Sequence, residues 1–175
     1  MDVITFSVVT LFFIGQKYMC WHIYIDLLSK PSMQKYRYLP HTADMRFRSY
    51  GRDFGEALEN AAAALLNIML DVKRIEKDGS GSRTITIKET ADSESEMAWF
   101  VLQDILSKID SMKLNAYKFK VTSVKRANKI SMTGKLTCKK TKADYAMLSV
   151  KAVTPHDLNV KKAKAGVSIN IVVDV

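Results

Sequence analysis

The sequence contains few of the residues that mark fibrous, secreted or disordered chains. Its 175 residues include 7 glycines, 3 prolines and 2 cysteines. So little glycine and proline excludes a collagen-like or mucin-like chain, and a hydrophobic fraction of 47% excludes global disorder. Cys20 and Cys138 are too few for a disulfide-stapled scaffold, so we expect reduced thiols and an intracellular protein. Neither cysteine has a partner at zinc-finger spacing, which excludes that kind of zinc site.

The first 33 residues carry no arginine and no net charge. Their two basic and two acidic residues balance, so the net charge of +9 falls entirely on residues 34–175; the four residues are Lys17, Lys30, Asp2 and Asp26. The apolar run at residues 3–15 is shorter than the roughly 20 residues of a membrane-spanning helix. It has no basic residue before it and no small-residue cleavage pattern after it, unlike a secretory signal, and a mitochondrial presequence would be rich in arginine.

Three interpretations of residues 1–33 remain. The segment is a membrane-associating tail, a strand or helix packed on the rest of the chain, or an extension outside the working protein. A later methionine, Met33, directly precedes sequence of globular character. We expect residues 1–33 to be a poorly ordered or dispensable apolar extension without stable membrane insertion, and residues 34–175 to form a single domain.

Two segments of this domain have helical periodicity. Asp53 with Glu56, and Ser93 with Glu96, match the capping box that begins a helix. Apolar residues at helical spacing follow both boxes, and the first segment includes four consecutive alanines. The sequence therefore predicts helices over residues 54–69 and 94–109.

The remaining apolar pattern has a period of two, which is typical of strands. The predicted strands cover residues 45–50, 83–88, 117–122, 129–138, 148–152 and 167–175, and loops are expected at 71–81 and 139–146. Two helices among about six strands predict an α+β domain, in which the helices pack on mixed or antiparallel sheets.

Carboxylates gather at two predicted strand ends. The last strand is apolar to its final residue, so Asp174 is held beside the terminal α-carboxylate of Val175, and Asp44 precedes the first strand. Clustered oxygen ligands suit hard cations such as Ca²⁺, Mg²⁺ or Mn²⁺. Alternatively, Asp174 faces solvent and discourages edge-to-edge aggregation. Asp44 and Thr42 would then make only local turn hydrogen bonds.

Further polar residues lie close to these strand ends in the sequence. His41 and Thr42 directly follow Pro40, while Lys151 and His156 flank the end of another predicted strand. Such positions often carry functional groups on a rigid scaffold. The alternative is that each is an ordinary polar surface residue.

The basic charge favours an anionic partner, with nucleic acid first and a membrane surface second. Lysines at 139–142 and 161–164 are candidates for phosphate contacts, or form a solvated basic face. The basic residues are not interleaved with aromatic residues, so the sequence does not indicate sequence-specific RNA recognition. No phosphate-binding loop and no GxSxG nucleophile motif is present. A stand-alone basic RNA-binding or chaperone-like module is therefore one alternative function.

Four stretches in order resemble the archease family. They are residues 38–44 (YLPHTAD), residues 45–71 with the alanine-rich helix ending in IMLD, residues 151–154 (KAVT) with His156, and residues 172–175 (VVDV). The resemblance covers residues 35–175 and leaves out the apolar extension. Two departures are Pro155, where many members carry a larger residue, and the basic loop at residues 161–166.

The resemblance implies a protein cofactor rather than an enzyme. Archeases promote guanylylation and multiple turnover of RtcB-type RNA ligases in tRNA splicing, so the implied partner is such a ligase, with GTP and RNA reached through it. The implied divalent metal would be held by Asp44, Asp174 and Val175, with His41, Thr42, Lys151 and His156 in support. The implied location is the cytoplasm, the nucleus or both, as part of the tRNA-splicing ligase complex.

Overall fold

The computed structural model describes residues 34–39, 44–141 and 143–175, which belong to one of the two compact units of the chain, Met33–Val175. Its elements in chain order are β1 (Tyr36–Leu39), β2 (Met45–Gly51), α2 (Phe54–Met69), α3 (Val72–Lys77), β3 (Ser82–Ala91), α4 (Glu94–Met112), β4 (Asn115–Arg126), β5 (Ile130–Lys139), β6 (Ala152–Ala163) and β7 (Gly166–Asp174).

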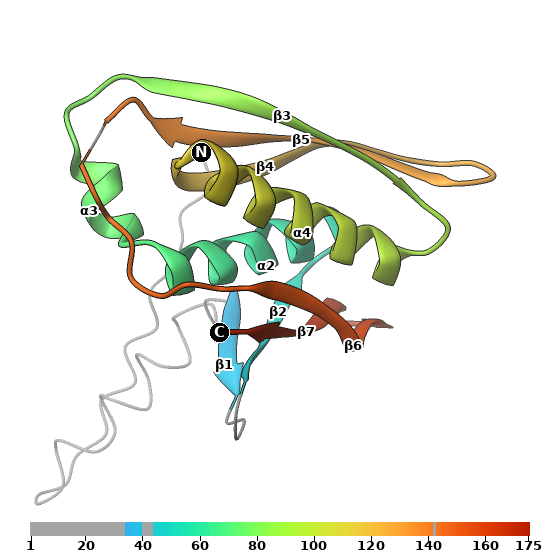
Figure 1. The fold of residues 1–175 in the computed structure, drawn as a ribbon. Coiled ribbons are helices and arrows are strands. Elements are labelled where there is room, and N and C mark those ends of the chain that lie inside the picture. Colours follow the sequence, from blue (N-terminus) through green and yellow to red (C-terminus); the bar gives the residue numbers. More distant parts are fainter. Residues whose placement is uncertain (1–33, 40–43, 142) are drawn as a thin grey trace, which may run out of the picture. The chain divides into compact units, whose positions relative to one another are not determined.

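The strands form two antiparallel sheets with the helices between them (Figure 1). One sheet has the order β1-β2-β7-β6 and the other has the order β3-β5-β4, and neighbouring strands within each sheet are antiparallel. This arrangement confirms the predicted α+β class. Each sheet buries one face against the helices, as layered domains require, and turns the other face outward.

Both long helices begin at the predicted capping residues. The Asp53 carboxylate accepts from the Glu56 N–H at 2.9 Å, and the Ser93 hydroxyl accepts from the Glu96 N–H at 3.1 Å. Each glutamate reaches back one residue further than in the usual capping box, to the N–H of Arg52 or Asp92. These bonds satisfy backbone donors that a helix N-terminus otherwise leaves open.

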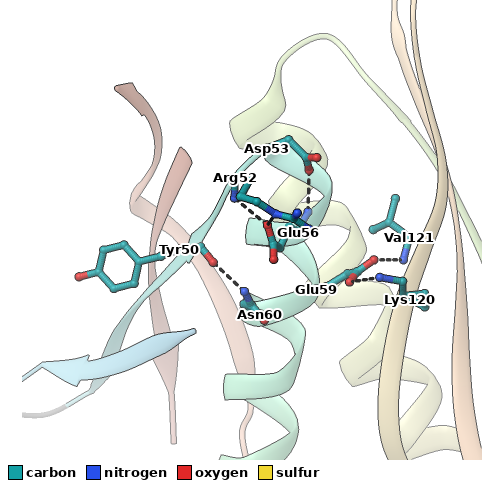
Figure 2. A network of polar contacts seen from close by, with 8 residues as sticks. All are labelled: Tyr50, Arg52, Asp53, Glu56, Glu59, Asn60, Lys120 and Val121. Atoms are coloured by element: carbon teal, nitrogen blue, oxygen red, sulfur yellow. Dashed lines mark hydrogen bonds and ion pairs between the residues drawn. The ribbon is translucent and has the colours of Figure 1, made fainter. Parts of the chain in front are cut away.

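Helix α2 connects the two sheets through polar side chains on successive residues (Figure 2). The Asn60 amide donates to the Tyr50 carbonyl of β2 at 2.7 Å. The Glu59 carboxylate accepts from the Val121 N–H of β4 at 2.9 Å and from the Lys120 ammonium at 2.8 Å. Val121 lies beside a bulge in the β4–β5 pairing, so the carboxylate bonds the backbone where the ladder is irregular.

The core follows the predicted apolar stripes. Alanines on α2 are completely buried and let the helix approach both sheets; they are Ala57, Ala61, Ala62 and Ala64. Helix α4 buries apolar residues on several sides, including Met97, Leu102 and Leu106. In the described part of the chain, no helix has both the length and the apolar character to cross a membrane.

Four local expectations are wrong. Residues 72–77 form the short helix α3 rather than a loop, because Asp71 caps it by accepting from the Arg74 N–H. Residues 148–151 are not a strand, and the strand instead begins at Ala152. It continues to Ala163, so the residues around His156 lie within β6 rather than after a strand end. The expected basic loop at residues 161–166 is instead a tight turn at residues 164–165 between β6 and β7.

Candidate metal centre at the end of the four-stranded sheet

The antiparallel register gathers three chain segments at one end of the four-stranded sheet. Met45 of β2 pairs with Val173 of β7, and Asp174 pairs with Ala152 of β6. Asp44 directly precedes β2, so it lies at the same end of this sheet as Asp174. The C-terminal end of β7 therefore lies between the start of β2 and the start of β6 (Figure 1).

The two carboxylates belong to the outward face of this sheet. Alternate side chains of a strand point to opposite faces. The paired residues Phe47 and Ile171 are fully buried against the helices, so Asp44 and Asp174, at odd spacing from them, share the other face. Both residues are half-buried.

Lys151 fixes the chain beyond β7. Its backbone N–H donates to the Asp174 carbonyl at 2.8 Å, and its ammonium donates to a main-chain oxygen of Val175 at 2.9 Å. The predicted supporting residue is therefore placed against two of the three predicted ligands. Its ammonium therefore lies at the end of β7, within hydrogen-bond distance of Val175.

Helix α4 holds the outer edge of β6, which is the edge strand of this sheet. The Gln103 side chain accepts from the Val153 N–H at 3.0 Å, and the Trp99 indole donates to the Val153 carbonyl at 2.9 Å. The helix thus satisfies backbone groups that an edge strand exposes. Since Val153 follows Lys151 by two residues, these bonds also fix the position of Lys151.

A bulge in β6 covers the neighbouring part of the outward face. The register shifts between Thr154 and Asn159, and Asp157 adopts a left-handed backbone with φ of 57°. Asp157 then reaches Arg46 of β2, with 2.6 Å between carboxylate and guanidinium. Asn170 donates to the Asp157 carbonyl at 3.1 Å and is only 9% exposed beneath the bulge. Sequence reasoning missed this ion pair, although Pro155 inside a strand pattern is itself a signal of a bulge.

The structure brings some predicted site residues together and leaves others apart. Asp174, Val175 and Lys151 are in direct contact, and the register adds Asp44. His156 projects from the bulge with its side chain 85% exposed, and its ring nitrogen lies 3.7 Å from Asp157. No hydrogen bond or ion pair among residues 143–175 joins it to Asp174. His41 and Thr42 lie outside the described residues.

The protein groups at this end of the sheet that could bind a metal are few, and their donor atoms are oxygens. Within residues 34–39, 44–141 and 143–175, no three His, Cys, Asp or Glu side chains converge as metal ligands. Two carboxylates and one main-chain oxygen still suit a hard cation, which completes its shell with water. The residues present therefore fit Ca²⁺, Mg²⁺ or Mn²⁺ better than a metal that needs several nitrogen or sulfur ligands.

Cys138 offers no nucleophile. It lies fully buried on the helix-facing side of β5, and burial raises the pKa of its thiol to about 11. A thiol with such a pKa is protonated at neutral pH, and the thiolate is the reactive form. This result removes thiol chemistry at Cys138 from the candidate functions.

A groove of about 680 Å³ lies between the C-terminal parts of α2 and α4 and the segment that precedes β6. Met69, Ile109 and Met147 are among its lining residues. None of the predicted site residues that the structure describes lines it, so the groove and the carboxylates are separate features.

The fold and this strand end define a class: an α+β protein with two acidic residues, Asp44 and Asp174, at one end of a four-stranded sheet. The family model described as the Archease protein family matches residues 36–175. The chain belongs to the archease family.

Individual relatives agree with this assignment. The chain is 32% identical to Protein archease of Methanosarcina barkeri over 146 residues, covering 81% of this chain and 97% of the relative. It is 28% identical to Protein archease of Archaeoglobus fulgidus, with 81% and 99% of the two chains covered. The solution structure of Methanobacterium thermoautotrophicum protein 1598 has the same fold, with a TM-score of 0.68, 24% identity, and coverage of 82% of this chain and all of the other.

Proposed function

We propose that this chain is a protein cofactor, rather than an enzyme, that promotes guanylylation and multiple turnover of an RtcB-type RNA ligase in tRNA splicing. It would do so with a divalent metal held by Asp44, Asp174 and Val175. Membership of the archease family supports the partner class. The observation that supports the metal site is the β2–β7 register, in which the paired residues Met45 and Val173 directly adjoin Asp44 and Asp174 in the chain.

The residues have distinct parts in this proposal. Asp44 and Asp174 provide carboxylate oxygens and Val175 a main-chain oxygen, and the bound metal would supply positive charge toward phosphates of GTP in the ligase. Lys151 orients the chain beyond β7 through its two bonds to Asp174 and Val175. His41, Thr42 and His156 would support contacts with the ligase around this end of the sheet.

The partners and location follow from the same proposal. GTP and RNA are bound by the ligase and meet this chain only in the complex. The working location would be that of the tRNA-splicing ligase complex, in the cytoplasm, the nucleus or both. The apolar extension is not required, so a chain beginning at Met33 is expected to stimulate the ligase as the full chain does.

The test is a guanylylation assay with the matching ligase, GTP and a divalent metal. Asp44→Asn and Asp174→Asn remove charge at nearly constant volume, and each is expected to reduce stimulation by at least tenfold. Asp110→Asn on the exposed surface of α4 makes the same chemical change elsewhere and is expected to stay within twofold of the original protein.

Two further measurements separate the parts of the proposal. Calorimetry with Ca²⁺ should show binding to the original protein and to Asp110→Asn, and loss of binding in Asp174→Asn. Undiminished stimulation by a correctly folded Asp174→Asn variant would refute the metal site. Absence of any stimulation by the original protein would refute the cofactor role and favour a module that works without the ligase.

A further inference from the structure

The outward face of the three-stranded sheet has a uniform chemical character. Its register pairs Thr86 with Lys135 and Lys88 with Thr133 on one side of β5. On the other side, Lys118 pairs with Thr137 and Lys125 with Ser131. We call this surface, defined by Lys88, Lys118, Lys125 and Lys135, the lysine face.

The alternation of burial proves that these side chains point away from the helices. Ile87 and Leu136, which lie one residue from Lys88 and Lys135, are fully buried. Phe119, next to Lys118, is 5% exposed. The four lysines are all exposed, and Figure 1 shows both long helices on the opposite side of this sheet.

The face carries no carboxylate to neutralise its lysines. All three strands are fully described, and the outward positions between the lysines hold threonine and serine. No ion pair among the described residues engages the four lysines. Lys120 is also outward by register and lies opposite Lys135, but its ammonium turns to Glu59 of α2 at 2.8 Å.

Cations elsewhere in the domain are often compensated. Lys108 pairs with Asp104 on α4, Lys129 pairs with Asp92, and Glu94 accepts from both Arg126 and Lys162. Like charges on neighbouring sheet positions repel one another and reduce stability. The fold therefore maintains a positive surface at some cost and without internal compensation.

We propose that the lysine face binds the phosphate backbone of single-stranded nucleic acid, without reading its sequence. Neighbouring strands lie about 4.8 Å apart and alternate residues about 7 Å apart along a strand, so the ammonium groups form a close-set array. Threonine and serine hydroxyls between them add hydrogen-bond donors for phosphate oxygens. Such contacts position a backbone but carry no base specificity.

The composition of the face favours nucleic acid over a lipid surface. Membrane-surface binding usually combines basic residues with apolar side chains that enter the interface. The outward positions here have no aliphatic side chain, and the single aromatic residue at one end, Tyr117, shares a hydrogen bond with Ser82 at 3.2 Å. This surface is distinct from the strand end with Asp44 and Asp174, and it requires no ligase.

The test compares two variants with equal loss of charge. The face variant combines Lys88→Gln, Lys118→Gln, Lys125→Gln and Lys135→Gln. The control variant combines Lys35→Gln, Lys73→Gln, Lys77→Gln and Lys113→Gln, four exposed lysines outside the face and outside the lysine clusters at 139–142 and 161–164. The probe is a fluorescent 20-nucleotide RNA of mixed sequence, titrated without ligase at several salt concentrations, and urea unfolding confirms that both variants fold.

The face variant is expected to bind at least tenfold more weakly than the original protein, and the control variant within twofold. Loss of four phosphate contacts should reduce the slope of log K against log salt by about 3. If both variants bound RNA equally weakly, net charge alone would explain the binding, and the proposal would be overturned. A lack of RNA binding by the original protein, or binding of phosphatidylserine vesicles by this face in place of RNA, would also overturn it. Because no ligase is present, none of these results bears on the guanylylation assay.

Discussion

The two sheets turn similar helix-facing surfaces inward and very different surfaces outward. The four-stranded sheet brings Asp44 and Asp174 to one end and covers part of its outer face with the Asp157–Arg46 ion pair. The three-stranded sheet presents only lysines and hydroxyl side chains at comparable positions, apart from Tyr117 at one end. Side chains at outward positions do not have to be apolar to pack in the core. The different chemistry of the two outward faces therefore reflects a requirement other than folding.

The largest expected effect tests how closely the four-stranded sheet approaches α2. A Cβ atom at Gly51 would lie 2.2 Å from the Ala57 backbone nitrogen, so Gly51→Ala forces the strand and helix apart. We expect the free energy of unfolding to fall by about 3 kcal/mol or more, measured by urea denaturation.

The three-stranded sheet offers a matched glycine. A Cβ at Gly134 would meet the Phe119 ring at 2.4 Å, and a ring can move more readily than a backbone. Gly134→Ala should therefore cost less than Gly51→Ala, and Gly79→Ala, with nothing within 4 Å, should change stability least. If Gly134→Ala lost more free energy of unfolding than Gly51→Ala, the closer backbone approach would be in the three-stranded sheet.

Glu94 is expected to have the next largest effect, because it links the two sheets. Its carboxylate is 11% exposed and lies 2.7 Å from Arg126 of β4 and 2.9 Å from Lys162 of β6. Burial acts to raise the pKa of this carboxyl, but the hydrogen bonds from Lys162 and Arg126 outweigh it and hold the pKa below its ordinary value of 4.5. Glu94→Gln should lower the free energy of unfolding by about 2 kcal/mol at pH 7.

The lowered pKa of Glu94 also determines how its contribution to the free energy of unfolding depends on pH. Stability from a carboxyl whose pKa falls on folding is complete above the unfolded-state pKa and is lost as the pH falls through the folded-state pKa. The difference between the original protein and Glu94→Gln should therefore be constant near neutral pH and shrink below about pH 4.5. Urea unfolding from pH 7 to pH 3 measures it, and Glu76→Gln, an exposed charge change on α3, serves as control. A difference that grows toward acid pH would contradict the assignment.

A smaller effect is expected at the bulge of β6. Asparagine adopts the left-handed backbone as aspartate does, so Asp157→Asn removes the charge and keeps the geometry. We expect a loss of about 1 kcal/mol in urea unfolding, because Arg46 is 28% exposed and partly desolvated. Asp92→Asn breaks the Lys129 pair, whose side chains are 60% and 68% exposed, and should cost under about 0.5 kcal/mol. If Asp157→Asn and Asp92→Asn lost equal free energy of unfolding, the partial burial of Arg46 would not strengthen its ion pair with Asp157.

The smallest stability effect is expected on the lysine face. Lys135 lies opposite Lys120, so Lys135→Thr relieves like-charge repulsion and replaces a lysine with a better strand former. Unfolding at low salt should show unchanged or slightly raised stability, by about 0.3 kcal/mol. The difference should diminish at high salt because screening weakens repulsion between exposed charges. A clear loss of stability in Lys135→Thr would show that Lys135 stabilises the fold, which is not expected of a residue on the lysine face.

Local patterns were sufficient for much of this fold. Asp53 and Ser93 cap the predicted helices because an N-cap acts within three residues of itself. The alternation along β5 predicted its buried face, since side chains of a strand alternate between its two sides. On β7 the prediction was incomplete, because residues 169–173 are buried on both faces. The sequence also singled out Asp44 and Asp174 through their places at strand ends, while their role in metal binding stays a prediction.

Tertiary structure decided which strand ends meet. No local pattern brings residue 44 to residue 174 or Lys151 to Val175, because strand order depends on how distant segments share one core. The same holds for the bulge that joins Asp157 to Arg46, and for the lysine face, which exists only once β3, β5 and β4 align in register. The amino-acid pattern by itself determined helices, strand faces and the basic charge of residues 34–175. Packing of the two sheets around α2 and α4 determined where the acidic and basic groups gather.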